Sequence, residues 1–399
     1  MDGLTALIKT RIKHLVKIYL PASLKVRYLL SVNPPRYPQH VFIEPTTRCN
    51  INCVYCGRSY WKSRDPKRDL SFDLYKKILR QLVEKGVKGI TLQGGGEPLL
   101  HRDIFEMIVL ARSLGLFTRF NTNLTSLTEE EAERLVRSGH SAIDLSIDTV
   151  DPALFADLRR GTTLEHVLGN LRKISEAKKR LGSDHPQIHA NAVLTKASLQ
   201  GLSELIAEMK KAGVTRMNLA DMNTDGVDLN VVLRDGSRLG DNLLSRMPEG
   251  DVVQALAEVR RLASKEFEIC MPGDLVGRKG VAKRPPGVIT CAELWERPFI
   301  DSAGRMTPCC WLPDGDIITL GDFNTQSFDE IWFGERYELL RRQHLTNRHP
   351  LNCARCQQLM YVVAAPSRLR AAPEPVKEYA QVFVGKGPKD IVRDSTAGG

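Results

Sequence analysis

The chain has 399 residues, of which 42% are hydrophobic and 26% are charged, and it carries a net charge of +10 at neutral pH. This length supports two domains and a sizeable core. No segment approaches the roughly 18 consecutive apolar residues of a membrane-spanning helix, and we recognise no secretory signal peptide. Nine cysteines in a chain without an export signal favour a reducing, cytoplasmic location, where clustered thiols bind metal more often than they form disulfides.

The first segment, residues 1–38, is basic and amphipathic. Six of its first 30 residues are Lys or Arg and only one is acidic, which accounts for half of the net charge. Apolar residues recur at helical spacing from Leu4 to Tyr19, beside three lysines spaced four residues apart. This pattern is typical of a helix that lies on an anionic membrane, so residues 1–30 predict peripheral membrane contact. A helix that packs on the following domain is the alternative.

Residues 39–235 alternate between apolar strands and amphipathic helices. The predicted strands are the HVFIEPT segment from residue 40 and residues 89–95, 117–123, 141–148, 187–194 and 216–222. The predicted helices are residues 72–85, 102–114, 128–138, 164–181 and 198–212. Six strands with five intervening helices predict a parallel α/β sheet, and the loops after the strands then share one face, where such folds place their chemistry.

Three further segments complete the predicted organisation. Residues 236–288 form a linker with one helix, which we expect at 252–265. Residues 289–364 form a small cysteine-bearing domain. Residues 365–399 contain Pro366, Pro373 and Pro375 and end in STAGG, so we expect a partly disordered tail.

Three cysteines lie within eight residues, at Cys49, Cys53 and Cys56. Thiolates typically hold iron–sulfur clusters with one cysteine per iron. Three cysteines on a four-iron cluster leave one iron free for a small bidentate ligand, such as an amino group with a carboxylate. A zinc site with a fourth ligand from elsewhere is the alternative.

The spacing C-x3-C-x-aromatic-C, with Tyr55 at the aromatic position, resembles the signature of the radical SAM superfamily. The resemblance implies a partial (β/α)6 TIM-like barrel with a three-cysteine [4Fe–4S] cluster. It also implies that S-adenosylmethionine is cleaved to a 5′-deoxyadenosyl radical with a reductant such as flavodoxin or ferredoxin. The segment LQGGGEPLL adds to the resemblance, because Gly95, Gly96 and Glu97 match the GGE motif that holds the methionyl amino group in that family.

Polar residues at the ends of the later strands are further candidates for contact with the cofactor. The resemblance implies such contacts for Asn123, Ser146, Asp148, Arg160 and Asn191. Arg159 is the alternative to Arg160, and for the others a simple polar cap on a strand end is the alternative.

Four cysteines near the C-terminus form a second pattern: Cys291, Cys309, Cys353 and Cys356. Four thiolates hold zinc or a fully ligated cluster with equal ease. The spacing resembles the SPASM/twitch extension that follows radical SAM barrels, and it implies one auxiliary [4Fe–4S] cluster. Cys310 is the alternative to Cys309.

Cys270 lies just before the cysteine-bearing domain. If it faces the barrel mouth, its thiol could donate a hydrogen atom to a substrate radical, as an epimerase requires. A structural thiol is the alternative reading.

We therefore predict a radical SAM oxidoreductase or epimerase that takes hydrogen from a C–H bond of a polar small molecule: a sugar, aminocyclitol or nucleotide sugar. One alternative is a maturase of a ribosomally made peptide, and another is an enzyme acting on a lipid or lipid-linked sugar at the membrane. We predict no nucleic-acid partner, because the excess charge lies in one amphipathic helix and no basic strand carries interleaved aromatic residues.

Overall fold

The computed structural model describes residues 36–60, 65–224, 227–271, 288–291, 293–310, 315, 318–346, 348–350, 353 and 360–362. The predicted amphipathic helix within residues 1–30 and the predicted tail lie outside this part of the chain. Among the described residues, no helix is both long and apolar enough to cross a membrane.

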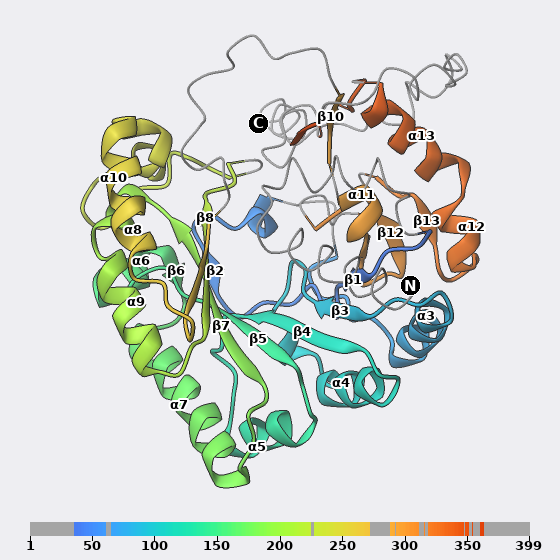
Figure 1. Cartoon of the computed structure of the whole chain (residues 1–399), viewed down its shortest axis with the longest axis horizontal. Coiled ribbons are helices and arrows are strands. Elements are labelled where there is room, and N and C mark those ends of the chain that lie inside the picture. Colours follow the sequence, from blue (N-terminus) through green and yellow to red (C-terminus); the bar gives the residue numbers. More distant parts are fainter. Residues whose placement is uncertain are drawn as a thin grey trace, which may run out of the picture.

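One curved sheet of ten strands organises the molecule (Figure 1). Its central strands are β1 (His40–Ile43), β3 (Gly89–Leu92), β4 (Phe117–Thr122), β5 (Ala142–Ser146), β7 (Gln187–Leu194) and β8 (Arg216–Asp221). They pair in that order and all run parallel. These are the six predicted strands, and the predicted α/β fold class is confirmed.

The sheet continues beyond the six central strands at both edges. β9 (Glu268–Cys270) pairs parallel with β8, and β11 (Phe299–Ile300) pairs parallel with β1. β12 (Arg305–Thr307) and β13 (Gly321–Asp322) then add antiparallel strands beside β11. The start of the cysteine-bearing domain is thus hydrogen-bonded to the barrel. We still propose the predicted domain boundaries, with residue 289 as the start of that domain.

Helices cover the outer face of the sheet (Figure 1). They are α3 (Phe72–Glu84), α4 (Ile104–Ser113), α5 (Glu129–Arg137), α7 (Leu164–Leu181), α8 (Lys196–Gln200) and α9 (Leu202–Lys211). Local sequence sets their ends: Thr128 and Glu131 form a capping box that starts α5, and Gly182 ends α7 in the left-handed conformation with φ 60°. Apolar side chains from the helices and the sheet form one continuous core between them.

Several short elements, most of which the sequence pattern does not predict, shape the loops and the C-terminal region. These are β2 (Asn52–Cys53), β6 (Arg159–Arg160), β10 (Val288–Thr290), β14 (Met360–Val362), α6 (Pro152–Leu158), α10 (Glu249–Arg260), α11 (Glu293–Glu296), α12 (Phe328–Trp332), α13 (Glu335–Leu345) and the 3₁₀ turns at Gly57–Tyr60, Pro98–Leu100, Leu239–Asn242 and Leu244–Arg246. Of these, only α10 falls on a predicted helix.

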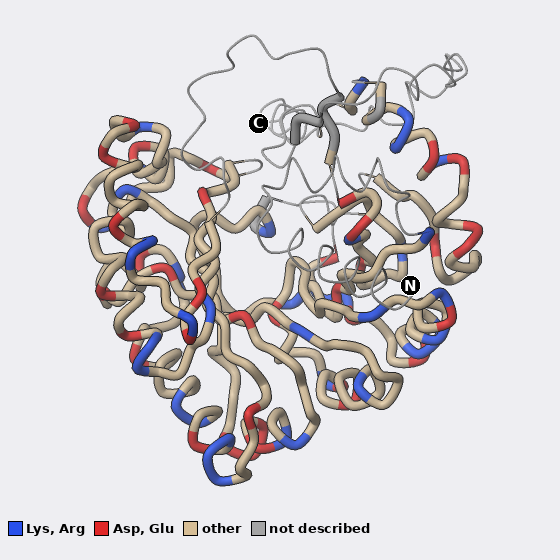
Figure 2. The backbone as a smooth tube through the Cα atoms, in the orientation of Figure 1, with Lys and Arg blue, Asp and Glu red and all other residues tan. Residues whose placement is uncertain are grey.

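The C-terminal elements pack beside α3. Lys77 Nζ donates to the carbonyl oxygen of Phe323 at 2.6 Å, and Lys85 Nζ lies 2.5 Å from Asp329 Oδ2 on α12. In the view of Figure 2, basic and acidic residues are interspersed along the outer helices.

Candidate active site

The cysteine loop leaves β1 and folds back onto the chain that follows α6. β2 pairs antiparallel with β6, which places Cys53 opposite Arg159 and Asn52 opposite Arg160. The backbone N–H of Cys56 donates to the carbonyl oxygen of Cys53 at 3.1 Å and closes a tight turn. All three cysteines of the loop therefore face one cavity.

This cysteine cavity has a volume of about 230 Å³ and lies at the carboxyl ends of β3, β4 and β5. Its lining includes Cys49, Cys53, Cys56, Arg58, Gln93, Gly94, Gly95, Gly96, Glu97, Asn121, Thr122, Asn123, Ser146 and Arg159. Three segments predicted separately from the sequence thus meet in one place, as expected for the loops of a parallel sheet. Of the predicted cofactor contacts, Gly95, Gly96, Glu97, Asn123 and Ser146 line this cavity.

Nitrogen donors lie beside two of the three thiols. Asn123 Nδ2 donates to Cys49 Sγ at 3.7 Å, and Arg159 Nη1 donates to Cys53 Sγ at 3.9 Å. Burial raises the pKa of Cys49 and Cys56, and it raises the pKa of Cys53 to about 12. The protein without iron therefore keeps these sulfurs protonated, and iron must displace the protons on binding.

The donor set fits a cluster held by three cysteines. Within the described residues, no three Cys, His, Asp or Glu side chains converge closely enough to share a single metal ion. The sulfurs that ligate a cluster each bind a different iron and do not meet at one point. Hydrogen-bond donors beside such sulfurs are a recognised influence on reduction potential, and Asn123 and Arg159 supply them here.

The glycine-rich loop after β3 lies against the start of the cysteine loop without room for a side chain. A Cβ on Gly96 would lie 2.3 Å from the carbonyl oxygen of Thr46 and 2.5 Å from that of Arg48. A Cβ on Gly94 would lie 2.3 Å from Glu44 Oε1. Both neighbours are fixed, because one is backbone and the other is a fully buried carboxyl group. Only glycine fits at these two positions.

Glu97 is buried, with only 2% of its surface exposed, and its carboxylate accepts hydrogen bonds from three sides. Oε1 accepts from the Thr122 hydroxyl at 2.8 Å and from the Leu99 N–H at 3.1 Å, and Oε2 accepts from the Asn123 N–H at 2.7 Å. Burial raises the pKa of Glu97 to about 7, and these donors oppose the rise. The arrangement holds an acidic group at a fixed place in the cavity, where it can meet an ammonium group.

Leu124 adopts a left-handed backbone conformation, with φ 54°, directly after this contact. Its N–H donates to the Thr122 hydroxyl at 2.8 Å, and its carbonyl oxygen accepts from Asn170 Nδ2 at 2.8 Å. Such a conformation is strained for a residue with a branched side chain. The turn directs the N–H of Asn123 at Glu97. The strained backbone of Leu124 therefore adjoins the contact that positions Glu97 in the cavity.

Asp148, by contrast, does not line the cavity and has its partners within the protein. It forms a buried ion pair with Arg159, whose Nε lies 2.8 Å from Asp148 Oδ2 and whose Nη2 lies 3.1 Å from Oδ1. The Tyr55 hydroxyl donates to the same carboxylate, and the Val193 N–H donates to it at 2.8 Å. Asp148 and Tyr55 therefore hold Arg159 in place, and Arg159 reaches the cavity.

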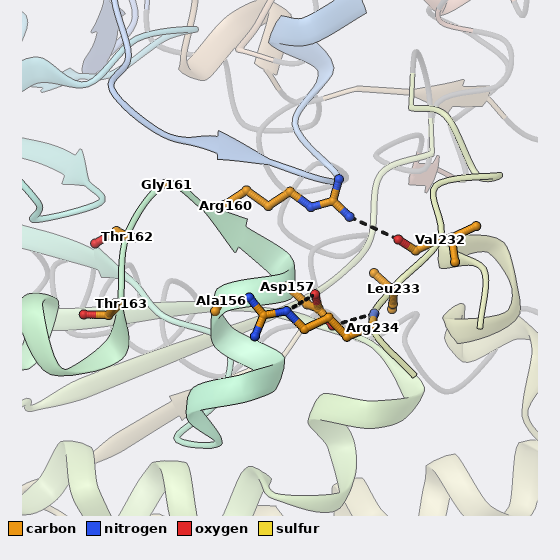
Figure 3. Close-up of a pocket in the computed structure, with 9 residues that line it drawn as sticks. All are labelled: Ala156, Asp157, Arg160, Gly161, Thr162, Thr163, Val232, Leu233 and Arg234. Atoms are coloured by element: carbon orange, nitrogen blue, oxygen red, sulfur yellow. Dashed lines mark hydrogen bonds and ion pairs between the residues drawn. The ribbon is translucent and has the colours of Figure 1, made fainter. Parts of the chain in front are cut away.

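Arg160 lies away from the cysteines. Successive residues of a strand point to opposite sides, so on β6 the alternative residue, Arg159, lines the cysteine cavity and Arg160 does not. Figure 3 shows Arg160 in a separate pocket of about 510 Å³, where its Nη2 donates to the Val232 carbonyl oxygen at 3.1 Å. Arg234 lies beside Asp157 in the same pocket, with Nε 3.2 Å from Oδ1. This pocket is larger but contains no thiol, so we place the chemistry in the cysteine cavity.

A third cavity, of about 370 Å³, adjoins the cysteine cavity on the inner face of the sheet, and both cavities are lined by Gln93 and Asn121. We call it the interior cavity. Asn191 lines it and accepts a hydrogen bond from Asn218 Nδ2 at 2.7 Å. Asn191 thus lies in the neighbouring cavity, outside the one that holds the cysteines.

Cys270 lies outside the lining of both cavities. It pairs with Asn218 in the β8–β9 register, and its thiol donates to Glu268 Oε1 at 3.3 Å. Burial and the Glu268 carboxylate raise the pKa of this thiol to about 11. Its role as a hydrogen-atom donor remains a prediction.

Three of the four predicted auxiliary ligands fall within the described residues. Cys309 and Cys353 are buried and Cys291 is partly buried, whereas Cys356 lies outside the described part of the chain. The assignment of Cys309 in preference to Cys310 as the ligand stays a prediction from the sequence.

Glu44 is a residue of this site that the sequence patterns do not predict. Its side chain is fully buried, Oε1 accepts from the Gly95 N–H at 2.7 Å, and Oε2 accepts from the Ser302 N–H at 3.1 Å. Glu44 therefore links the glycine-rich loop to the first turn of the cysteine-bearing domain. A carboxylate directly after an apolar strand was the only local signal.

Two family profiles match the chain. The Radical SAM superfamily profile matches residues 43–185, and the SPASM profile, an iron-sulfur cluster-binding domain, matches residues 291–357. These two ranges contain the first and second cysteine patterns respectively.

Relatives and solved structures agree with these matches. The PqqA peptide cyclase of Bradyrhizobium diazoefficiens is 28% identical over 80% of this chain and 79% of its own. A tungsten-containing aldehyde ferredoxin oxidoreductase cofactor-modifying protein of Pyrococcus furiosus is 29% identical over 50% of this chain, and the match spans 56% of that relative's length. Streptococcus suis SuiB, solved with its precursor peptide SuiA, superposes with a TM-score of 0.57 at 18% identity, covering 91% of this chain and 76% of SuiB.

These relatives overturn the predicted substrate and partner. We expected a sugar, aminocyclitol, nucleotide sugar or lipid-linked molecule. The relatives that match four fifths of the chain are named for a peptide substrate. The prediction of a polar small-molecule or lipid-linked substrate is therefore wrong, because cofactor motifs fix the type of radical chemistry and carry no information about the substrate.

Both cysteine patterns, the fold and the profile matches agree on the cofactors as well as the family. The chain belongs to the radical SAM superfamily: it is a radical SAM enzyme with a C-terminal SPASM domain, and it binds S-adenosylmethionine, a three-cysteine [4Fe–4S] cluster and an auxiliary [4Fe–4S] cluster.

Proposed function

We propose that this chain is a maturase that modifies a ribosomally made peptide by radical chemistry. The observation that carries the proposal is the match to PqqA peptide cyclases, which extends over 80% of this chain and 79% of the Bradyrhizobium protein. A match of that length spans the barrel and the SPASM region together, so the likeness is to a whole peptide-modifying enzyme.

We assign the residues of the cysteine cavity to the cofactor. When bound, the clusters and S-adenosylmethionine supply a 5′-deoxyadenosyl radical and a one-electron acceptor. Cys49, Cys53 and Cys56 hold the first cluster, and Glu97 receives the ammonium group of S-adenosylmethionine. The backbone of Gly95 and Gly96 approaches the cofactor closely, where a side chain at residue 96 would collide with Thr46 and Arg48.

We infer a net oxidation of the peptide in preference to an inversion. An inversion requires a hydrogen-atom donor at the substrate, and the thiol of Cys270 lies outside the lining of both cavities. Its hydrogen bond to Glu268 directs the thiol to a neighbour on the same strand. We also propose a cytoplasmic location, since thiols that ligate iron require reducing surroundings.

The proposal is tested by producing the protein together with each short peptide encoded near its gene. We expect one peptide to change in mass, and we expect the change to disappear with Cys53→Ala, which removes a ligand of the first cluster. The proposal fails if the purified enzyme releases 5′-deoxyadenosine with dithionite while none of these peptides changes. A product peptide that is lighter by the mass of two hydrogen atoms supports oxidation over inversion, because inversion returns a hydrogen atom to the carbon and leaves the mass unchanged.

A further inference from the structure

The lining of the interior cavity contains more cationic than anionic side chains. It contains the guanidinium groups of Arg119 and Arg297 but only one carboxylate, that of Asp144. Because the cavity shares Gln93 and Asn121 with the cysteine cavity, a group bound there lies next to the place that we assign to S-adenosylmethionine.

The two arginines are only partly used by the protein. Arg119 Nε lies 3.2 Å from Asp144 Oδ2 without the geometry of a hydrogen bond, and Arg119 Nη2 lies 3.3 Å from His189 Nδ1. Arg297 pairs through Nη2 with Glu293. A guanidinium group has five N–H donors, and the Nη1 atoms of both arginines have no partner among the described residues.

His40 does not change the charge of the cavity lining. The pKa of His40 shows that Arg119 and Arg297 both lie near it. Burial, chiefly, and the nearby charges of Arg119 and Arg297 lower the pKa of His40 to about 4. The imidazole is therefore neutral at physiological pH, and its Nε2 is engaged with the Thr91 hydroxyl at 2.7 Å. It adds neither a cation nor an anion to the cavity.

Neutral polar groups surround the two cations. The side-chain amides of Gln93 and Asn121 have no hydrogen-bond partner among the described residues, although both line the cavity. A carboxylate accepts about four hydrogen bonds, and it pairs with guanidinium groups through short, charge-assisted bonds. Two guanidinium groups and two amides therefore offer enough N–H donors to fill the hydrogen bonds that a carboxylate accepts.

We propose that the interior cavity binds a carboxylate of the substrate peptide through Arg119 and Arg297, next to the reacting atoms. This inference rests on the proposed peptide substrate. S-adenosylmethionine also carries a carboxylate. The cysteine cavity offers that carboxylate two other guanidinium groups, those of Arg58 and Arg159. A peptide can present such a carboxylate in two ways, as an acidic side chain or as its free C-terminus.

The test uses the anaerobically reconstituted full chain with S-adenosylmethionine and three small probes. N-acetyl-L-glutamate N-methylamide presents an acidic side chain, its glutamine analogue is the neutral isostere, and N-acetyl-L-alanine presents a C-terminal carboxylate. Binding is measured by ligand-observed NMR titration. We expect the glutamate probe to bind about tenfold more tightly than the glutamine probe, as a charge-assisted hydrogen bond implies.

Arg297→Gln and Arg119→Gln should each remove this preference, and Arg137→Gln, at an exposed arginine of α5, should retain it. Because Arg297 is 48% exposed, its variant should fold, which its melting temperature checks. Equal binding of the glutamate and glutamine probes overturns the proposal, as does a preference that survives in both cavity variants. Tighter binding of the alanine probe supports the proposal with the C-terminus as the source.

The experiment separates this inference from the proposed function. If no peptide is modified but the carboxylate preference and its dependence on Arg297 are present, peptide maturation fails and the carboxylate site stands. If a peptide is modified while the probes show no preference, the site fails alone.

Discussion

The two cysteine sites of this enzyme are built in different ways. The ligands of the first lie within eight residues of one loop, and the loop is fixed by backbone pairing with β6. The proposed ligands of the second come from segments as far apart as Cys291 and Cys353. The first site is therefore formed by a single loop of the barrel. The second site forms only when segments that are distant in the sequence come together.

The difference extends to the groups around the thiols. Around the first site, Asn123 and Arg159 donate to sulfur, and Asp148 in turn holds Arg159. These bonds join protein groups to one another, so we expect them to form without iron. A metal group that joins distant segments contributes its binding energy to folding, because those segments are not brought together in the unfolded chain. We therefore expect iron to matter for activity at the first site, and for both activity and stability at the second.

The largest effect should come from Cys53→Ala. Loss of this ligand should abolish release of 5′-deoxyadenosine with dithionite, while the melting temperature of the iron-free protein changes little, because the barrel forms without the loop's metal. Cys270→Ala is the matched control, since its thiol lies outside both cavities. Production of 5′-deoxyadenosine by the Cys53→Ala protein would contradict the assignment of the first site.

Cys309→Ala should remove one of the two clusters. We expect about half of the iron to be lost, as for one of two four-iron clusters, and the melting temperature of the iron-loaded protein to fall. Release of 5′-deoxyadenosine should persist, because the first site keeps its ligands. Cys310→Ala should retain the full iron content, since the spacing from Gly304 to Cys309 assigns the ligand role to Cys309. If Cys310→Ala loses iron and Cys309→Ala retains it, Cys310 is the ligand.

Asp148→Ala should destabilise the scaffold of the first site even without iron. It leaves the Arg159 guanidinium, whose side chain is 7% exposed, without its buried partner, which typically costs about 3–5 kcal/mol. Urea denaturation of the iron-free protein measures this loss. Glu133→Ala, which breaks exposed ion pairs with Arg137 and Arg180, is the control and should change stability little. If Asp148→Ala lowers the free energy of unfolding only in the iron-loaded protein, the scaffold does not form before the cluster binds.

The sequence predicts the parts of the molecule that depend on local spacing. The strands, the helices that cover them, the three-cysteine loop and the glycine-rich turn follow from patterns a few residues long. The choice between Arg159 and Arg160 does not, because it depends on the register of a two-residue strand against the cysteine loop. Glu44 was missed for a related reason: one of its partners, Ser302, lies 258 residues away.

The interior cavity shows the same limit. Arg119 comes from β4 and Arg297 from the segment that precedes β11, so no spacing in the sequence places them together. The substrate was mispredicted because the cofactor motifs, which are short and contiguous, carry no information about it. Local patterns thus identify the cofactors, and the tertiary structure is needed to approach the substrate.

The smallest effect that we predict concerns Glu97 and pH. Burial raises its pKa from 4.5 to about 7, so below pH 7 the folded protein holds it largely as a neutral acid. A neutral acid cannot pair with the ammonium group of S-adenosylmethionine. Affinity for S-adenosylmethionine should therefore rise with pH, at most about tenfold per pH unit, and level off above pH 7. Isothermal titration at several pH values measures this dependence, and Glu97→Gln should make it flat.

The same shift predicts the opposite trend in the stability of the cofactor-free protein. A carboxyl group whose pKa is raised by folding stabilises the protein fully below its unfolded value of 4.5, and this contribution is lost as the pH rises through about 7. The free energy of unfolding should thus fall over the pH range in which cofactor affinity rises, and Glu97→Gln should remove both trends. If affinity and stability change in the same direction, or if the glutamine variant retains either trend, another group is titrating and Glu97 does not receive the ammonium group.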